Sequence, residues 1–236
     1  MVDDDGRRVL VIGGSRSIRA AIVSRSASDG YDVSFTFAGS EAAEVLAGET
    51  GARAIRSDAA DRQALVQVAR DSGPLDVFVF NAGVFVSVDP LTLDPDVVDC
   101  MIDIDLRASY HAAVEAGRVI PDGGRIVVIG SGSGDRVAAP GFAAYAMTKS
   151  ALHGVAGGLA RGFGHREITV NVVLPGPSDT DMSPAAKPSA GTMHGFMALK
   201  RHSTAADVAS LIAYVAGPTA ESIAGSMQTI DGGWVA

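Results

Sequence analysis

The sequence predicts one α/β domain: a Rossmann-type, doubly wound parallel sheet of about seven strands with helices on both faces. Short runs rich in β-branched residues alternate with longer Ala-rich segments along the whole chain, which is typical of this fold class. Most of the runs are continuously apolar, as in strands that helices cover on both faces. The length of 236 residues, with 47% hydrophobic and 19% charged residues, supports one buried core and excludes a disordered chain or a coiled coil.

Seven short runs, most of them apolar, predict the strands, and the segments between them predict the helices. We expect strands at residues 8–12, 32–37, 53–56, 76–80, 125–129, 169–174 and 227–230. We expect helices near residues 16–29, 40–49, 61–72, 94–119, 140–164 and 204–216, and Thr204 belongs to a capping-box variant that begins the last one. No repeat or interdomain linker is visible, so residues 1–236 are expected to form one dinucleotide-binding and catalytic domain.

The segment before the last helix does not fit this alternation. Residues 175–201 are rich in Pro, Ser, Gly and Met and are only weakly periodic. A long excursion at the carboxyl edge of a strand is more often a binding lid than a plain loop. We therefore expect a mobile substrate lid at about residues 177–201, with a plain loop as the alternative.

Charge and cysteine content restrict partners and location. Nineteen basic and twenty-seven acidic side chains give a net charge of −8, which argues against a nucleic-acid polymer or an anionic membrane as partner. The single cysteine, Cys100, cannot form an internal disulfide, which fits a reducing cytosol. Residues 1–5 lack signal-peptide character, and the apolar stretch 137–160 contains Pro140 and Lys149 and is no membrane span. We expect a soluble, cytoplasmic protein.

A glycine-rich turn follows the first predicted strand and reads Gly-Gly-Ser-Arg-Ser-Ile-Arg-Ala over residues 13–20. Such a turn aims unpaired backbone N–H groups and the positive end of the helix dipole at a phosphate. The residues that would hold a pyrophosphate are Gly13, Ser15, Arg16, Ser17 and Ile18. The spacing is not the usual GxGxxG, so an ordinary Gly-Ser turn is the alternative.

The end of the second strand favours NADP(H) as the cofactor. It reads Phe37-Ala38-Gly39-Ser40, with no Asp or Glu to hold a ribose 2′-hydroxyl. Arg16 in the neighbouring turn suits a 2′-phosphate, and Ser40 could cap the next helix. The alternative is that Arg16 is a solvated surface charge.

Tyr145 and Lys149 lie about one turn apart in the helix predicted near 140–164, so both project from one face. A lysine ammonium stabilises a nearby phenolate and lowers the pKa of a phenol from about 10, which makes it a useful proton donor or acceptor. Ser131 follows the fifth strand, where its hydroxyl can hydrogen-bond a carbonyl oxygen. Without that serine the pair is a weak signal, because Tyr and Lys at this spacing often form the solvent face of a helix.

These features occur in the order found in the short-chain dehydrogenase/reductases, which the chain resembles over essentially its whole length. The shared features are the turn at 13–19, Asp58, Asn81-Ala82-Gly83, Ser131, Tyr145 with Lys149, Pro175-Gly176, and Asp231-Gly232-Gly233. The resemblance implies that Tyr145 is the general acid/base, that Ser131 orients the carbonyl and that Lys149 binds the nicotinamide ribose. It thus implies an NADP(H)-dependent enzyme that reduces a small-molecule carbonyl or oxidises an alcohol.

The resemblance also implies cofactor contacts and an assembly. It places Asp58 at the adenine, Asn81, Ala82 and Gly83 along the adenine-ribose side, and Pro175, Gly176 and Thr180 beside the nicotinamide. Family members are usually homotetramers or dimers built on the helices that correspond to about 94–119 and 140–164. Residues 37–40, 130–136 and 216–219 are similar to the cyclic-di-GMP-binding biofilm dispersal mediators, a subgroup of the family.

The chain departs from the family pattern at positions that concern the site. Ser17 and Arg19 replace glycines of the phosphate turn, and Arg19 either obstructs the cofactor or swings outward and adds positive charge. Asp105 stands where the family has asparagine as its fourth catalytic residue. It either competes with a tyrosinate for the charge of Lys149, or it turns to Arg107 or solvent and has little effect.

No metal site is expected, because the five histidines show no ligand spacing and Asp99, Asp103 and Asp105 are typical of a solvated acidic face. Two functions remain open. The complete Ser/Tyr/Lys set favours an oxidoreductase. The narrower likeness, with Ser17, Arg19 and Asp105, favours a weakly catalytic or non-catalytic regulator that holds cyclic di-GMP or NADPH in the same cleft.

Overall fold

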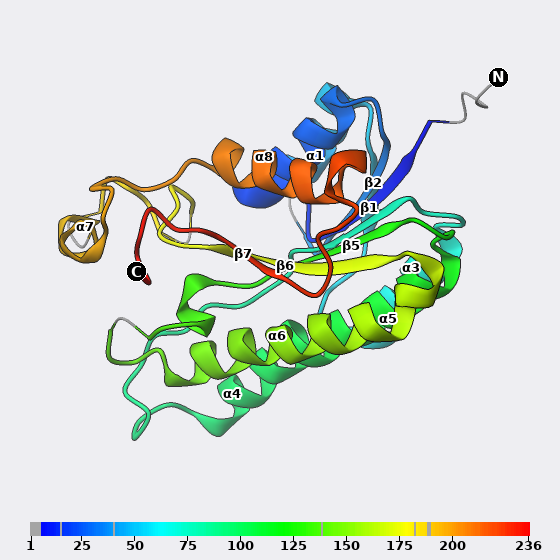
Figure 1. The fold of residues 1–236 in the computed structure, drawn as a ribbon. Coiled ribbons are helices and arrows are strands. Elements are labelled where there is room, and N and C mark those ends of the chain that lie inside the picture. The colour runs from blue at the N-terminus through cyan, green and yellow to red at the C-terminus, as the bar shows by residue number, and fades with distance from the viewer. Residues whose placement is uncertain (1–5, 15, 40, 138, 182, 188–189) are drawn as a thin grey trace.

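A computed structural model describes residues 6–14, 16–39, 41–137, 139–181, 183–187 and 190–236. Its centre is a parallel sheet of seven strands in the order β3-β2-β1-β4-β5-β6-β7. The strands are β1 (Arg8–Ile12), β2 (Asp32–Phe37), β3 (Arg53–Arg56), β4 (Val77–Phe80), β5 (Arg125–Ile129), β6 (Thr169–Pro175) and β7 (Met227–Ile230). The predicted doubly wound sheet is confirmed, and its order reverses between β1 and β4 (Figure 1).

Helices cover both faces of this sheet. One face packs against α1 (Ile18–Ser28), α2 (Ala42–Thr50) and α8 (Ala205–Ala216), and the other against α3 (Arg62–Asp71), α5 (Ser109–Val119) and α6 (Ala143–Phe163). Figure 1 shows α1 and α8 above the sheet and α3, α5 and α6 below it. Short 3-10 turns occur at η2 (Gly132–Gly134), η3 (Gly164–Arg166) and η4 (Pro218–Ala220). Within the described ranges, no helix combines the length and apolarity needed to cross a membrane.

The central strands β1, β4, β5 and β6 bury side chains on both faces, which explains their mostly apolar sequences. In β1, Val9 and Val11 pack into the layer that contains α1 and α8, whereas Leu10 and Ile12 pack toward α3 and α5. Each of the four is at most 2% exposed. Burial of apolar surface stabilises the folded state by about 25 cal/mol per Å² removed from water. Both helical layers therefore stabilise the sheet and hold the carboxyl ends of its strands in place.

The long helix predicted over 94–119 is divided into three parts. α4 (Pro95–Met101) is followed by a π-helix, η1 (Ile102–Ala108), and then by α5. A π-helical turn is wider than an α-helical one and frequently occurs at a functional site. Here it carries Asp105, which is buried rather than part of a solvated acidic face, so the expectation for this residue was wrong.

The segment at 177–201 contains a short helix that its weak periodicity did not predict. This helix, α7 (Ala190–Phe196), lies beyond the end of the sheet near the C-terminus (Figure 1). Its Phe196 lies edge-on to Trp234, with ring centroids 6.1 Å apart. Met197, which follows the helix, is buried. The end of α7 is therefore packed against the C-terminal residues.

Candidate active site

A cavity of about 430 Å³ lies at the carboxyl ends of the strands, where the strand order reverses. Ligands bind at this position in open α/β sheets, and the volume is in the range of small-molecule sites. The walls come from the turn before α1, the loops after β4 and β5, the beginning of α6 and the segment after β6.

Most residues singled out in the sequence meet on these walls. They are Arg16, Ser17, Ile18, Asn81, Gly83, Ser131, Tyr145, Lys149, Pro175, Gly176 and Thr180. Four others, Gly13, Asp58, Ala82 and Asp105, are not on the wall. Ser15 and Ser40 lie outside the described residues.

Two of the residues off the wall, Gly13 and Asp58, have defined local surroundings. Gly13 has a φ of 79°, and a Cβ at this position would lie 3.2 Å from the backbone of Ala82. Asp58 is exposed after β3, where its Oδ1 accepts a hydrogen bond from the N–H of Ala60 at 2.9 Å. Its contact with an adenine therefore stays a prediction.

The phosphate turn is strained at Ser17, whose φ is 54° and ψ is −127°. This backbone conformation is readily accessible to glycine, and an L-residue held in a sparsely populated region costs on the order of 1–3 kcal/mol. The preceding Gly14 fixes the turn, because a Cβ there would come within 2.5 Å of the Phe35 side chain. The serine thus occupies a geometry that the fold imposes.

The same turn is tied to the beginning of the 177–201 segment. The N–H of Asp181 donates to Oγ of Ser17 at 3.2 Å, and Oδ2 of Asp181 lies 3.9 Å from Nε of Arg16. Both partners of this ion pair are largely exposed, so it contributes little free energy. It does place the carboxylate next to Arg16 at the cavity entrance.

Arg19 lies across the cleft rather than outward, yet its guanidinium still lines the cavity as a positive charge. Its Nη2 donates to the backbone oxygen of Gly83 at 3.2 Å, which joins α1 to the loop after β4. Burial lowers the pKa of the Arg19 guanidinium from its usual value, and the neighbouring Arg16 lowers it further. The side chain still carries its charge near neutral pH, so the cleft holds a cation where the family has a glycine.

The beginning of α6 brings Tyr145 and Lys149 to the cavity. Nζ of Lys149 lies 5.6 Å from the centroid of the Tyr145 ring, and the lysine side chain is 6% exposed. Phe85 packs edge-on against the same ring at 5.0 Å. Ser131 follows β5, and its Oγ accepts a hydrogen bond from the N–H of Ser133 at 3.2 Å, which leaves its hydroxyl hydrogen free for a ligand.

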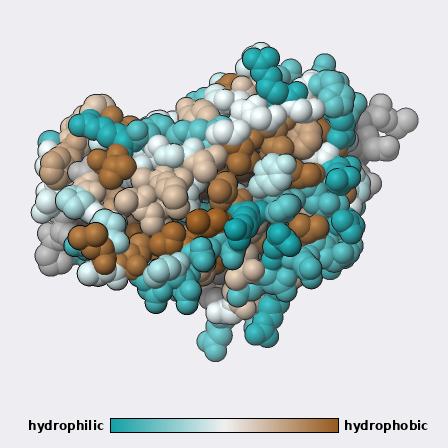
Figure 2. Space-filling model, turned by 90° about the horizontal axis from the view of Figure 1, so that it is seen from below, coloured by the Kyte–Doolittle hydropathy of each residue, from teal (hydrophilic) through white to brown (hydrophobic). Residues whose placement is uncertain are grey.

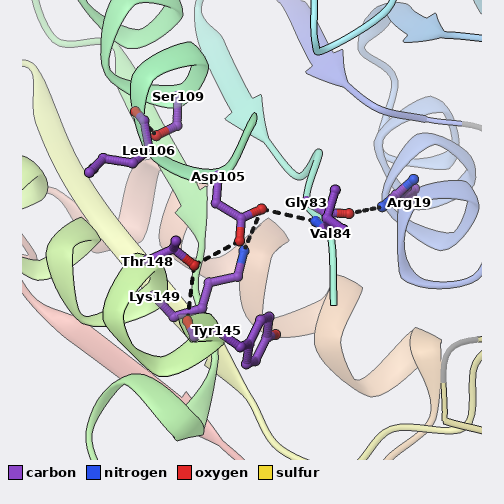
Figure 3. A network of polar contacts seen from close by, with 9 residues as sticks. All are labelled: Arg19, Gly83, Val84, Asp105, Leu106, Ser109, Tyr145, Thr148 and Lys149. Atoms are coloured by element: carbon purple, nitrogen blue, oxygen red, sulfur yellow. Dashed lines mark hydrogen bonds and ion pairs between the residues drawn. The ribbon is translucent and has the colours of Figure 1, made fainter. Parts of the chain in front are cut away.

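Asp105 lies behind Lys149 and forms three polar contacts (Figure 3). Its Oδ1 is 3.7 Å from Nζ of Lys149 and accepts from the N–H of Val84 at 2.9 Å, while its Oδ2 accepts from Oγ1 of Thr148 at 2.8 Å. The carboxylate therefore faces the lysine and does not turn to Arg107, which pairs with Asp103 instead. The alternative in which Asp105 turns to Arg107 or to solvent is therefore wrong, and its competition with a tyrosinate for the charge of Lys149 stays a prediction.

A histidine pair in the 177–201 region was missed by the sequence analysis. Nε2 of His194 lies 2.8 Å from Nδ1 of the buried His202, whose Nε2 lies 3.3 Å from Oγ of Ser183 on the cavity wall. The two histidines meet only because α7 folds back toward residue 202, so their spacing along the sequence did not predict the contact. Within the described ranges, no group of three His, Cys, Asp or Glu side chains is arranged to hold a metal ion.

Acidification is expected to release α7 through this pair. Burial, and then the charge of His194, lower the pKa of His202 below its usual 6.5, while Asp179 acts in the opposite direction. The pKa of His202 is lower in the folded state than in the unfolded state. The stability that the neutral His202 gives to the packing of α7 is therefore fully present above about pH 6.5, and it is lost as the pH falls through the folded-state pKa. The fluorescence of Trp234, the single tryptophan, reports the change through its contact with Phe196.

The control for this titration is another histidine. His202→Gln should abolish the acid transition in fluorescence, whereas His165→Gln, at an exposed position, should retain it. An unchanged transition in the His202 variant would exclude the histidine pair as its cause.

Comparisons with known proteins relate the whole chain to oxidoreductases. A family model described as enoyl-(acyl carrier protein) reductase matches residues 13–235. The cyclic-di-GMP-binding biofilm dispersal mediator protein of Escherichia coli (strain K12) is 53% identical over 228 residues, which cover 96% of each chain. The 3-oxoacyl-[acyl-carrier-protein] reductase MabA of Mycobacterium tuberculosis (strain ATCC 25618 / H37Rv) is 35% identical over 231 residues, 96% of this chain and 92% of the relative.

Solved structures of the same fold include complexes with a cofactor. The crystal structure of BdcA in complex with NADPH is 53% identical, with a TM-score of 0.95 and coverage of 97% of this chain and 94% of that chain. A short-chain dehydrogenase from Burkholderia cenocepacia J2315 in complex with NADP is 42% identical, with a TM-score of 0.94 and coverage of 98% of both chains.

Proposed function

Because the chain belongs to the short-chain dehydrogenase/reductase family, as its motifs predicted, we propose that it is an NADP(H)-dependent oxidoreductase acting on a carbonyl or an alcohol. The observation that carries this proposal is the placement of Ser131, Tyr145 and Lys149 around one cavity. The three side chains come from two separate segments, and each has a role in proton transfer to a carbonyl oxygen.

NADP(H) suits the charges on the cavity wall. Arg16 and Arg19 place two cations at the beginning of α1, where a phosphate-bearing ligand also meets the helix dipole. Arg16 is the residue that would hold a 2′-phosphate, although it must then exchange its contact with Asp181. The relatives solved with NADPH and NADP support this choice. When bound, the nicotinamide supplies or accepts the hydride.

The protein's own residues supply the proton and the orientation. Ser131 donates a hydrogen bond to the substrate oxygen, and the hydroxyl of Tyr145 gives that oxygen its proton during reduction. The Lys149 ammonium, held near the Tyr145 ring, stabilises the phenolate that remains. Asp105 does not reach the cavity wall, so we assign it as a positioning residue that holds Lys149.

The substrate lid and the assembly belong to the same proposal. Residues 177–201 would move over a small-molecule substrate, and Thr180 and Ser183 on the wall would contact it or the cofactor. Figure 2, viewed from the side of α4 and α6, shows a band of hydrophobic residues bordered by hydrophilic ones. Exposed Tyr110 on α5 and Met147 on α6 are suited to a homodimer or homotetramer contact. A cytoplasmic location is proposed on the single cysteine.

A second candidate function is a nucleotide-binding regulator with little or no turnover. The 53% identity to the cyclic-di-GMP-binding biofilm dispersal mediator favours it, as do the strained Ser17 and the cation of Arg19 in the turn. Both functions use the same cavity, so the nature of the bound nucleotide distinguishes them.

Separate titrations with NADPH, NADH and cyclic di-GMP test the two functions. An oxidoreductase should enhance NADPH fluorescence on binding, prefer NADPH to NADH, and oxidise NADPH with at least one carbonyl of a chemically varied panel. Binding of cyclic di-GMP without NADPH-linked turnover of any panel compound would exclude the enzyme and support the regulator.

A further inference from the structure

We propose that Arg19 acts on the catalytic pair from across the cleft: through the Gly83–Val84 peptide it positions Asp105 and, through Asp105, the ammonium of Lys149. This role of Arg19 as a positioning residue rests on the proposed oxidoreductase function. Figure 3 shows the contacts as one continuous network from α1 to α6.

The central element of this network is a single peptide unit bonded at both ends. Its carbonyl oxygen, on Gly83, accepts from Nη2 of Arg19 at 3.2 Å, and its N–H, on Val84, donates to Oδ1 of Asp105 at 2.9 Å. Hydrogen bonds at the two ends of one amide polarise each other. The guanidinium therefore strengthens the N–H donor that holds the carboxylate.

The peptide has no room to move independently of the ion pair. A Cβ added to Gly83 would lie 3.0 Å from Nζ of Lys149 and 3.1 Å from Oδ1 of Asp105. The other oxygen of Asp105 is fixed by Thr148 at 2.8 Å. A shift of the loop after β4 therefore acts directly on the distance between the carboxylate and the ammonium.

The direction in which Arg19 affects the phenolate of Tyr145 follows from the alternating charges of Arg19, Asp105 and Lys149. The charged groups around Tyr145 are Lys149 on α6, Asp105 on η1 and Arg19 on α1, with Arg16 and Asp181 at the cavity entrance. A stronger N–H donor draws the Asp105 carboxylate away from Lys149, which leaves more of the ammonium charge for the phenolate. Loss of the guanidinium weakens that donor and also removes a cation, so both effects destabilise the phenolate.

The same side chain also lines the cavity. One of its five N–H groups is used by Gly83 among the described residues, and the side chain lines the cavity next to Ser17 and Ile18. A phosphate-bearing ligand would therefore contact the same side chain that positions Asp105 through the Gly83–Val84 peptide. Occupancy of the phosphate turn is thereby transmitted to Lys149 and Tyr145.

The test uses Arg19→Gln, with Arg19→Lys as the conservative variant and Arg16→Gln as the matched control. Arg16 is in the same turn and carries the same charge, but its ion pair is with Asp181 rather than with the loop after β4. For alcohol oxidation with NADP⁺, Arg19→Gln should move the rising limb of the pH profile of kcat/KM upward by about half a pH unit. Arg19→Lys should recover part of this shift, and Arg16→Gln should weaken NADPH binding without moving the limb.

A second readout does not require turnover. The phenolate absorbance of each variant is followed against pH without cofactor, and the matching Tyr145→Phe spectrum is subtracted. The phenolate of Tyr145 should develop at higher pH in Arg19→Gln than in Arg16→Gln. Equal shifts in these two variants, or no shift in either, would overturn the positioning role. Absence of turnover in every variant would instead refute the proposed function, while the absorbance still decides the role of Arg19.

Discussion

Tyr145→Phe should lower kcat/KM for carbonyl reduction by a factor of about 10²–10⁴, because it removes the proton donor and leaves the rest of the cavity in place. The ring is held by Phe85 at 5.0 Å, so a phenylalanine keeps the same packing. NADPH affinity, measured by fluorescence titration, should change little. The two measurements together separate a chemical role of the hydroxyl from a structural one.

The matched control is Tyr110→Phe, which removes a hydroxyl from an exposed tyrosine on α5. It should keep the full rate. Retention of more than about one tenth of the rate in Tyr145→Phe would be incompatible with general acid catalysis by this residue, since that catalysis contributes at least about 10²-fold.

Asp105→Ala should reduce the free energy of unfolding by about 3–5 kcal/mol, because it leaves Lys149 as an unpaired buried charge. The side chains of Lys149 and Asp105 are 6% and 0% exposed, and the substitution also removes the acceptors of Val84 and Thr148. Urea denaturation measures the loss. Asp105→Asn, which retains an acceptor oxygen, should lie between Asp105→Ala and the unmodified chain.

Asp103→Ala is the control for the same helix. Asp103 pairs with Arg107 at the surface, where the two side chains are 49% and 60% exposed, so its loss should cost at most about 1 kcal/mol. Similar losses for Asp103→Ala and Asp105→Ala would show that the buried pair contributes no more than a surface one.

The parts of the fold that local pattern determines were predictable. Continuous apolar runs predicted the central strands, because β1, β4, β5 and β6 are buried on both faces. The Tyr145/Lys149 pair was predictable for a similar reason, since spacing along one helix alone places both side chains on one face. Most of the predicted site residues consequently meet in one cavity.

The remaining features depend on contacts between distant segments. Asp105 belongs to a run of acidic residues, and only the π-helix and the packing of α6 decide that it is buried against Lys149. Arg19 reaches Gly83, which is 64 positions away along the chain. The His194–His202 contact requires the fold of α7, which weak periodicity did not predict. In each case, tertiary packing rather than local preference determines the result.

The strained backbone of Ser17 lowers the free energy of unfolding of the molecule. The free energy of unfolding of a globular domain is only about 5–15 kcal/mol. A non-glycine residue held in a backbone region that favours glycine lowers it by on the order of 1–3 kcal/mol. In this chain the strained residue lies in the turn that we propose to hold the diphosphate, so a ligand bound there would offset part of this loss by binding the folded state alone and would raise the thermal unfolding midpoint.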